Sequence, residues 1–150
     1  MREGIEWTER ALEAADEPGP ALEGRALLVL GVGHSELGER DRAEELLEAC
    51  LPLLEAGGLP HEHAFALYYL GGLLLSRDRI AEAEEIYRRS EEEALALGDP
   101  TLIGAARGGL AEAYADRGDL ARARALLEKD RKSTRLNSSH ALLSRMPSSA

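Results

Sequence analysis

The chain has 150 residues, of which 44% are apolar and 31% are charged, a balance typical of a folded globular protein rather than a disordered or fibrous one. Its formal net charge of -10 disfavours direct binding to nucleic acid, because a surplus of carboxylates repels a polyanion. The single cysteine, Cys50, has no partner for an internal disulfide, and no apolar run approaches the roughly 20 residues of a membrane helix. We therefore expect a cytoplasmic protein that does not interact with membranes.

Residues 130–150 differ in composition from the rest of the chain. They hold six serines, against three in all of residues 1–129, and four basic side chains against one acidic one. The segment from Asp130 to His140 resembles one reading frame of a common short-read sequencing adapter, and Ser144 to Ala150 resembles the stretch after its variable index. The alternative is a natural tail rich in serine and arginine. We predict that residues 130–150 are an artefactual, disordered tail and expect the native protein to be longer.

The remaining residues repeat with a period of 40, which is the strongest signal in the sequence. Four columns recur in one register: Pro20, Pro60 and Pro100; Leu30, Leu70 and Leu110; Ala43, Ala83 and Ala123; and Leu47, Tyr87 and Leu127. Trp7 precedes Leu47 by the same period, so the chain begins with the second half of an earlier unit. A period in this range indicates a solenoid of stacked supersecondary units.

Each unit is predicted to form two helices. In the second unit, Pro60 suits a helix start, and a first helix extends from His61 to about Arg77. A second helix follows over residues 80–97. Apolar residues at helical spacing form the expected buried sides: Ala66, Leu67, Leu70, Leu73 and Leu74 in the first helix, and Ile80, Ala83, Ile86, Tyr87, Ala94 and Leu97 in the second. The charged residues Glu82, Glu84, Glu85, Arg88 and Arg89 are expected to point outward.

The same pattern predicts the organisation of the whole chain. We expect a partial repeat at residues 1–15 (second helix only), repeat 1 at 20–57, repeat 2 at 60–97 and a truncated repeat 3 at 100–129. The small residues of the column Gly31, Gly71 and Ala111 would let the two helices of a unit approach closely. The fold class that follows is all-α, a right-handed α-solenoid of antiparallel helix pairs, with about three repeats plus a partial N-terminal one.

These repeated positions carry a resemblance. Leu30-Gly31 with Ala43 and Leu47, Leu70-Gly71 with Ala83 and Tyr87, and Leu110-Ala111 with Ala123 and Leu127 resemble tetratricopeptide repeats (TPR). The resemblance covers residues 1–129, although the usual unit has about 34 residues and this one is longer. Long units of this kind resemble the sensor arrays of bacterial MalT-like and LuxR-type regulators.

No motif in the chain predicts catalysis. A phosphate-binding loop is missing, and His61 and His63 lie two residues apart, a spacing that does not share a helix face. We interpret His34 as a packed residue, Cys50 as a small residue between helices, and Glu91-Glu92-Glu93 as a solvated face. We therefore predict a non-enzymatic protein that needs neither a metal ion nor a cofactor.

A binding surface is predicted instead, because the first helices of stacked pairs line the concave side that this class of solenoid uses for binding. The groove residues expected from their positions are Arg25, Leu28, Val32, Phe65, Tyr68, Tyr69, Glu112 and Asp116. They would form a groove that is apolar and aromatic at its centre and acidic at one end. The alternative is that Tyr68 and Tyr69 only cover the seam between two units.

The leading hypothesis is a protein–protein interaction module, a fragment of a larger bacterial regulatory or signalling protein, that binds a peptide segment or an intramolecular regulatory domain. Co-chaperones of the TPR class hold a terminal carboxylate with basic and amide side chains at set groove positions. The corresponding residues here lack a charged donor, which favours an apolar or basic segment: Leu28, Val32, Tyr69, Ala105 and Gly109. A sensor of a small effector molecule and a purely structural scaffold remain as alternatives.

Overall fold

The structure, a computed structural model, describes residues 2–143, with side chains described for residues 2–132. Over this range the chain forms seven helices and no strand. The helices are α1 (Arg2–Ala14), α2 (Pro20–Glu36), α3 (Arg40–Ala56), α4 (Pro60–Leu75), α5 (Ile80–Leu97), α6 (Pro100–Asp116) and α7 (Leu120–Leu143).

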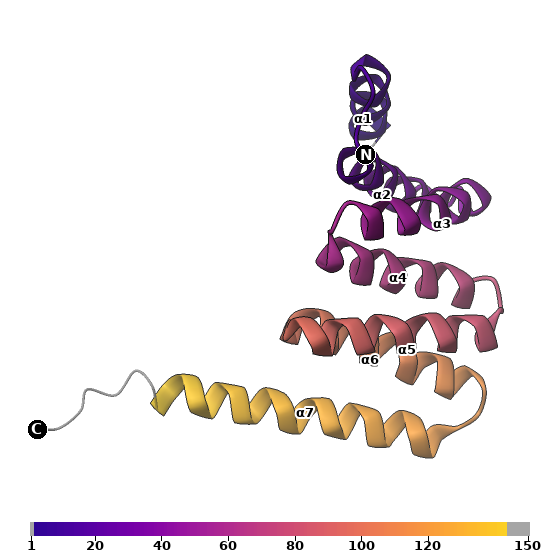
Figure 1. The fold of residues 1–150 in the computed structure, drawn as a ribbon. Coiled ribbons are helices and arrows are strands. Elements are labelled where there is room, and N and C mark those ends of the chain that lie inside the picture. The colour runs from indigo at the N-terminus through magenta and orange to yellow at the C-terminus, as the bar shows by residue number, and fades with distance from the viewer. Residues whose placement is uncertain (1, 144–150) are drawn as a thin grey trace, which may run out of the picture.

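The helices stack in one direction, with α1 at one end and α7 at the other (Figure 1). Each helix packs on the next one in the chain, and α2, α4 and α6 also contact one another in succession. Within the described residues, α3 does not contact α5, nor α5 contact α7. The stack therefore curves toward α2, α4 and α6, which line its inner side. The prediction of an all-α solenoid of helix pairs is confirmed.

Local sequence signals fix where the helices begin and end. Pro60 is the first residue of α4, where its missing N–H has no intrahelical acceptor to lose. Gly98 ends α5 in the left-handed conformation (φ 67°), which glycine adopts without steric cost. The Asp99 side chain then accepts hydrogen bonds from the backbone N–H groups of Thr101 and Leu102 and caps α6.

Glycines in the first helices receive large side chains from the second helices. A Cβ atom added at Gly31 would lie 2.9 Å from Leu47 Cγ, so Leu47 occupies the space that a side chain would fill. The Tyr87 ring lies against two glycines, and an added Cβ would approach it to 2.9 Å at Gly71 and 2.3 Å at Gly109. This close approach is the reason that α4 and α6 tolerate glycine, which costs about 1 kcal/mol relative to alanine within a helix.

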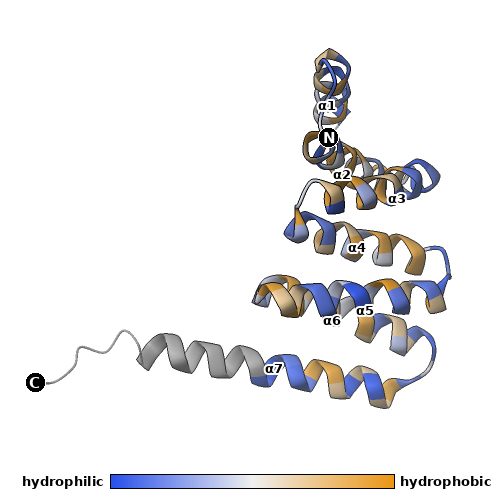
Figure 2. Ribbon diagram, in the orientation of Figure 1, coloured by the Kyte–Doolittle hydropathy of each residue, from blue (hydrophilic) through white to orange (hydrophobic). Residues whose placement is uncertain are grey.

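Residues at equivalent positions of the repeats differ in burial, because the helices at the two ends of the stack have fewer neighbours. Leu47 and Tyr87 are buried, whereas Trp7 and Leu127, one period before and after them, are 69% and 53% exposed. Among the described residues no helix precedes α1 and none follows α7, so these end positions lack the cover that the central ones have. The hydropathy of the helices differs in the same way: the central helix α4 is largely apolar, whereas the described part of the terminal helix α7 is mixed (Figure 2).

Two expectations for α5 are corrected. Glu84, expected to point outward, is buried and accepts hydrogen bonds from Arg88 and Arg117, each at 2.7 Å. The run at residues 91–93 is not a uniformly solvated face, because Glu91 pairs with Arg107 at 2.7 Å and Glu93 lies 2.7 Å from a ring nitrogen of His63. Charged side chains at these positions find partners on the neighbouring helices, which a single-helix pattern does not predict.

An ion-pair ladder connects successive repeats. Glu44 in α3 pairs with Arg77, which follows α4, at 3.0 Å, and also pairs with Arg79. One period later Glu84 in α5 pairs with Arg117, which follows α6. Glu44 and Glu84 are 40 residues apart, as are Arg77 and Arg117. The 40-residue period therefore includes charged positions as well as apolar ones.

The C-terminal segment differs from the prediction of a disordered tail. Residues 130–143 continue α7, and Asp130 lies 3.7 Å from the Arg107 guanidinium. The physical reason is that no glycine or proline interrupts the chain between Gly118 and Pro147. Residues 144–150, which the tail prediction also covered, lie outside the described residues.

Candidate functional site

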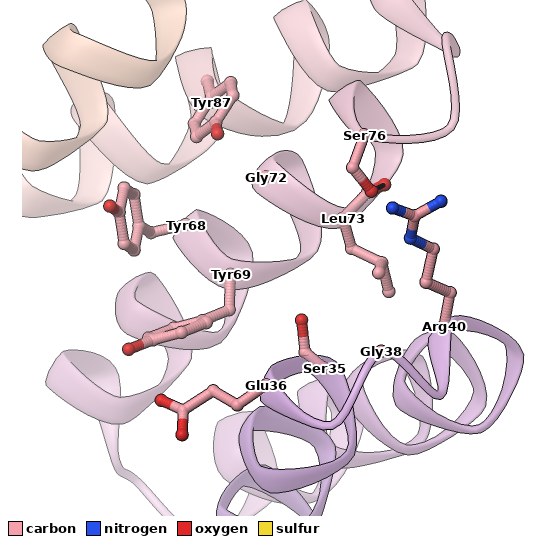
Figure 3. A pocket seen from close by; sticks show the side chains of 10 residues that line it. All are labelled: Ser35, Glu36, Gly38, Arg40, Tyr68, Tyr69, Gly72, Leu73, Ser76 and Tyr87. Atoms are coloured by element: carbon pink, nitrogen blue, oxygen red, sulfur yellow. Dashed lines mark hydrogen bonds between the residues drawn. The ribbon is translucent and has the colours of Figure 1, made fainter.

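A cleft of about 380 Å³ lies between the C-terminal half of α4 and the end of α2 (Figure 3). The residues that line it come from α2, the following turn, the start of α3, α4 and the residue after it, and α5: Ser35, Glu36, Gly38, Arg40, Tyr68, Tyr69, Gly72, Leu73, Ser76 and Tyr87. Because α2 and α4 belong to the inner side of the stack, the cleft opens on the side that the solenoid curves toward.

Aromatic rings form the centre of this surface. Tyr68 and Tyr69 have ring centroids 5.4 Å apart and ring planes at 79°, so they form two walls at nearly a right angle. Phe65 extends the cluster, 4.8 Å from Tyr69, and Tyr87 joins it 6.1 Å from Tyr68. Tyr68 and Tyr69 are only half-buried, so these rings present apolar surface to the cleft in addition to covering the core.

Gly72 opens the cleft to the buried Tyr87. A Cβ atom at position 72 would lie 3.2 Å from the Tyr87 hydroxyl oxygen, so the absence of a side chain there exposes this hydroxyl to the cleft. Burial raises the pKa of Tyr87, and the nearby Tyr68 and Glu112 raise it further. Tyr87 therefore stays neutral and offers a hydrogen-bonding group at the floor of the cleft.

The two ends of the cleft carry opposite charges. The Tyr69 hydroxyl and the Glu36 carboxylate extend toward the same end, whereas Arg40 lies at the other end beside Ser76 and Leu73 (Figure 3). Burial raises the pKa of Tyr69, and the negative charge of Glu36 adds to this effect. The cleft therefore has an aromatic, acidic end and a basic end.

A second hollow of about 300 Å³ adjoins the aromatic cluster between α4 and α6. Phe65, which is 41% exposed, lines it together with Leu102 and Ala105. Because the Phe65 ring also contacts the Tyr69 ring edge to face, lining residues of the two hollows touch each other in the aromatic cluster. Together they form a surface that crosses α4 from the end of α2 to the start of α6.

The structure brings together three of the eight predicted groove residues, Phe65, Tyr68 and Tyr69. Leu28 is a correction, because it is buried in the core and does not line the groove. Val32 is half-buried against the same core. The 40-residue pattern predicts which residues lie on an inner helix. It does not predict whether a given side chain of that helix faces the core or the groove.

The remaining predicted residues lie apart from the cleft. Arg25 pairs with Glu62 at 2.6 Å and borders an apolar hollow beside α1 instead. Glu112 and Asp116 are exposed on α6 and line neither of the two hollows. Sequence reasoning missed Arg40 and Tyr87, because Arg40 begins the outer helix α3 and Tyr87 belongs to a core column.

Cys50 and His34 each contact a nearby polar group of the chain. Burial raises the pKa of the Cys50 thiol to about 12, and its Sγ lies 3.1 Å from the backbone oxygen of Leu47. His34 Nδ1 lies 2.5 Å from the Glu39 carboxylate. Among the side chains of residues 2–132, no three His, Cys, Asp or Glu residues converge on a metal site. In the same part of the chain, no helix combines the length and apolar character that crossing a membrane requires.

Comparison with known proteins matches two parts of the chain to a repeat family. A family profile described as tetratricopeptide repeat matches residues 24–49 and 104–129. Among solved structures, the chain is similar to the crystal structure of BtubC (BKLC) from P. vanneervenii, with a TM-score of 0.77 and 20% identity. This similarity covers 86% of the present chain and 54% of BtubC, and at this identity it shows the fold alone. No curated protein matches the chain.

Proposed function

From the premise that this chain is a TPR-like repeat protein, we propose that it is a non-enzymatic interaction module which binds a segment of another protein in the cleft between α2 and α4. Repeats of this class generally mediate protein–protein interactions, and solenoids use their inner surface for this purpose. The segment lies across α4, on the tyrosines of the cleft and on Phe65.

The observation that carries this proposal is the half-buried aromatic cluster on the inner side of the stack. Tyrosine is enriched at the centres of protein interfaces, because its ring contributes apolar area and its hydroxyl a directional hydrogen bond. Tyr68 and Tyr69 give the surface its aromatic part, and charged residues border it, with Glu36 beside Tyr69 and Arg40 at the other end of the cleft. An apolar centre with a polar rim is the usual anatomy of an interface.

The shape of the surface favours an elongated occupant over a compact small molecule. Two hollows of about 380 and 300 Å³ meet at Phe65 and Tyr69, so the apolar surface continues from one repeat to the next. An extended segment or a helix would contact both hollows at once. A small effector would fill one of them and leave the other unused.

The wider context of the module is also part of the proposal. The chain spans 54% of the length of that protein, whose fold it shares over the matched part. We place the module in a larger bacterial regulatory or signalling protein of the cytoplasm, where it binds a partner or a regulatory domain of its own chain.

The proposal is tested with peptides selected against the protein. A display library of random twelve-residue peptides is selected on the full chain, and the enriched peptides are titrated against variants by calorimetry. Tyr69→Ala is expected to weaken their binding about ten-fold or more, because truncation of a central aromatic residue removes a large share of the interface energy.

Trp7→Ala is the matched control, because it also removes an aromatic ring but lies on α1, away from the cleft. It is expected to change the dissociation constant less than about two-fold. Equal losses in Tyr69→Ala and Trp7→Ala, with both variants folded by circular dichroism, would contradict the proposed site. Retained binding by Tyr69→Ala would contradict it as well.

A further inference from the structure

We infer that the anchor of the bound segment is a cationic side chain, lysine or arginine, held between the tyrosine walls and the Glu36 carboxylate. The inference rests on the proposed function and names the chemistry of its ligand. Its first support is geometric, because Tyr68 and Tyr69 stand at 79° to each other with centroids 5.4 Å apart. With centroids this close, a cation beside the pair lies near both rings, and a cation over a ring face within about 6 Å of the centroid is attracted to the ring.

Glu36 lies at an unfavourable place for a carboxylate. It is the last residue of α2, where the partial negative charge of the helix end repels an anion. Within residues 2–132 no arginine, lysine or histidine lies within 4 Å of its carboxylate. A cation bound beside Glu36 would compensate both the carboxylate and the helix end.

The ring faces of the cleft are also free of internal cations. Among the described residues, the two guanidinium groups that lie over aromatic rings are Arg10 on Trp7 and Arg122 on Tyr114. Tyr68 and Tyr69 have no such neighbour. The chain as a whole carries a formal net charge of -10, which attracts a basic segment at long range.

Arg40 restricts the position of the cation to one end of the cleft. It is the first residue of α3, where the helix end repels a cation, and no acidic group within residues 2–132 neutralises it in an ion pair. A basic side chain is therefore repelled at the Arg40 end and attracted at the Glu36 end. The segment is oriented by this difference.

The test uses two small probes that differ by one ammonium group, Nα-acetyl-lysine methylamide and Nα-acetyl-norleucine methylamide. Each is titrated into the full chain to about 50 mM, and binding is read from the tyrosine ring resonances in NMR spectra. The lysine probe is expected to bind about three-fold or more tighter than the norleucine probe and to shift the resonances of Tyr68 and Tyr69.

Charge variants locate the cation. Glu36→Gln is expected to weaken binding of the lysine probe about three-fold, and Arg40→Gln to strengthen it about two-fold, because each changes the charge at one end of the cleft. Binding of the norleucine probe should respond to neither. Glu48→Gln is the control, because it makes the same change in net charge on the exposed side of α3.

The outcomes separate this inference from the proposed function. Equal binding of the two probes, with both lost in Tyr69→Ala, would overturn the cationic anchor and leave an apolar segment as the ligand of the proposed site. A lysine preference that survives Glu36→Gln unchanged would overturn the assigned position. A lack of any response of Tyr68 and Tyr69 to either probe would overturn the inference, whereas the proposed function is decided by the selected peptides.

Discussion

The two interfaces between successive repeats are built from the same columns but with different residues. At the interface of α5 with α6, the large residue Tyr87 comes from the second helix and meets Gly109 on the first helix of the next repeat. At the interface of α3 with α4, the smaller Leu47 stands in the column of Tyr87, and Tyr69 stands in that of Gly109. The large aromatic residue thus comes from the first helix at one interface and from the second helix at the other.

This exchange explains why the cleft occurs at the first interface. Tyr69 lies on an inner helix and is half-buried at the cleft. Tyr87 lies on an outer helix, where its ring packs in the core and its hydroxyl reaches the cleft beside Gly72. A periodic scaffold thus presents different surfaces while its apolar columns stay in register.

The polar positions of the two interfaces differ as well. Leu51 and Leu67 at the first interface correspond to Glu91 and Arg107 at the second, where they form an ion pair with side chains only 14% and 5% exposed. A buried pair of this kind gains little over an apolar contact, but the loss of one partner leaves the other charge uncompensated.

The largest expected effect tests this difference. Glu91→Leu is expected to lower the free energy of unfolding by about 3–5 kcal/mol, because it leaves Arg107 buried with only Asp130, at 3.7 Å, nearby. The double variant Glu91→Leu/Arg107→Leu copies the first interface and is expected to recover the wild-type value to within about 1 kcal/mol or to exceed it. Urea denaturation measures both. A double variant no more stable than Glu91→Leu would show that the two interfaces are not equivalent in shape.

The next largest effect concerns the packing of the Tyr87 ring against Gly109. Gly109→Ala is expected to destabilise the fold by about 1–3 kcal/mol, because the new Cβ would lie 2.3 Å from the Tyr87 ring. The neighbouring Gly108→Ala meets nothing within 4 Å and is expected to stabilise α6 by about 0.5–1 kcal/mol. Thermal denaturation of the pair compares the two directly. A stabilising Gly109→Ala would mean that Tyr87 does not pack against α6.

The smallest effect uses Cys50, whose counterpart at the second repeat is the buried Ser90. The Cys50 thiol has its pKa raised from 9.0 to about 12 in the folded state. The thiol of the unfolded chain ionises at a lower pH than the buried thiol of the folded chain. The free energy of unfolding is therefore unaffected by this thiol below pH 9 and falls as the pH rises toward 12. At pH 9.5 the loss relative to neutral pH is about 0.8 kcal/mol. Cys50→Ser, which imitates Ser90, should lack this part of the alkaline decline in urea denaturation, and an unchanged decline would place the thiol in a solvated environment.

The period of the sequence was sufficient to predict the solenoid, because apolar columns and glycine positions depend on packing that each repeat has in common. The buried stripe of α4, from Ala66 to Leu74, followed from helical spacing alone. Glu84 and Glu91 could not be assigned in this way, since their burial depends on arginines that lie one helix further along the stack.

The candidate site was predictable only in part. Tyr68 and Tyr69 were found because they are aromatic and stand on an inner helix. Arg40 and Tyr87 were missed, because the cleft forms where a turn and a glycine, Gly72, open the space between two repeats. Such a gap depends on the pairing of large and small residues across an interface rather than on the period.

The most direct test of the account is an NMR map of a selected peptide bound to the protein, read from the rings of the four tyrosines. We predict that the resonances of Tyr68 and Tyr69 change on binding, while those of Tyr114 on α6 stay where they are. A bound peptide that shifts Tyr114 but leaves Tyr68 and Tyr69 unaffected would contradict the claim that the protein acts through this cleft.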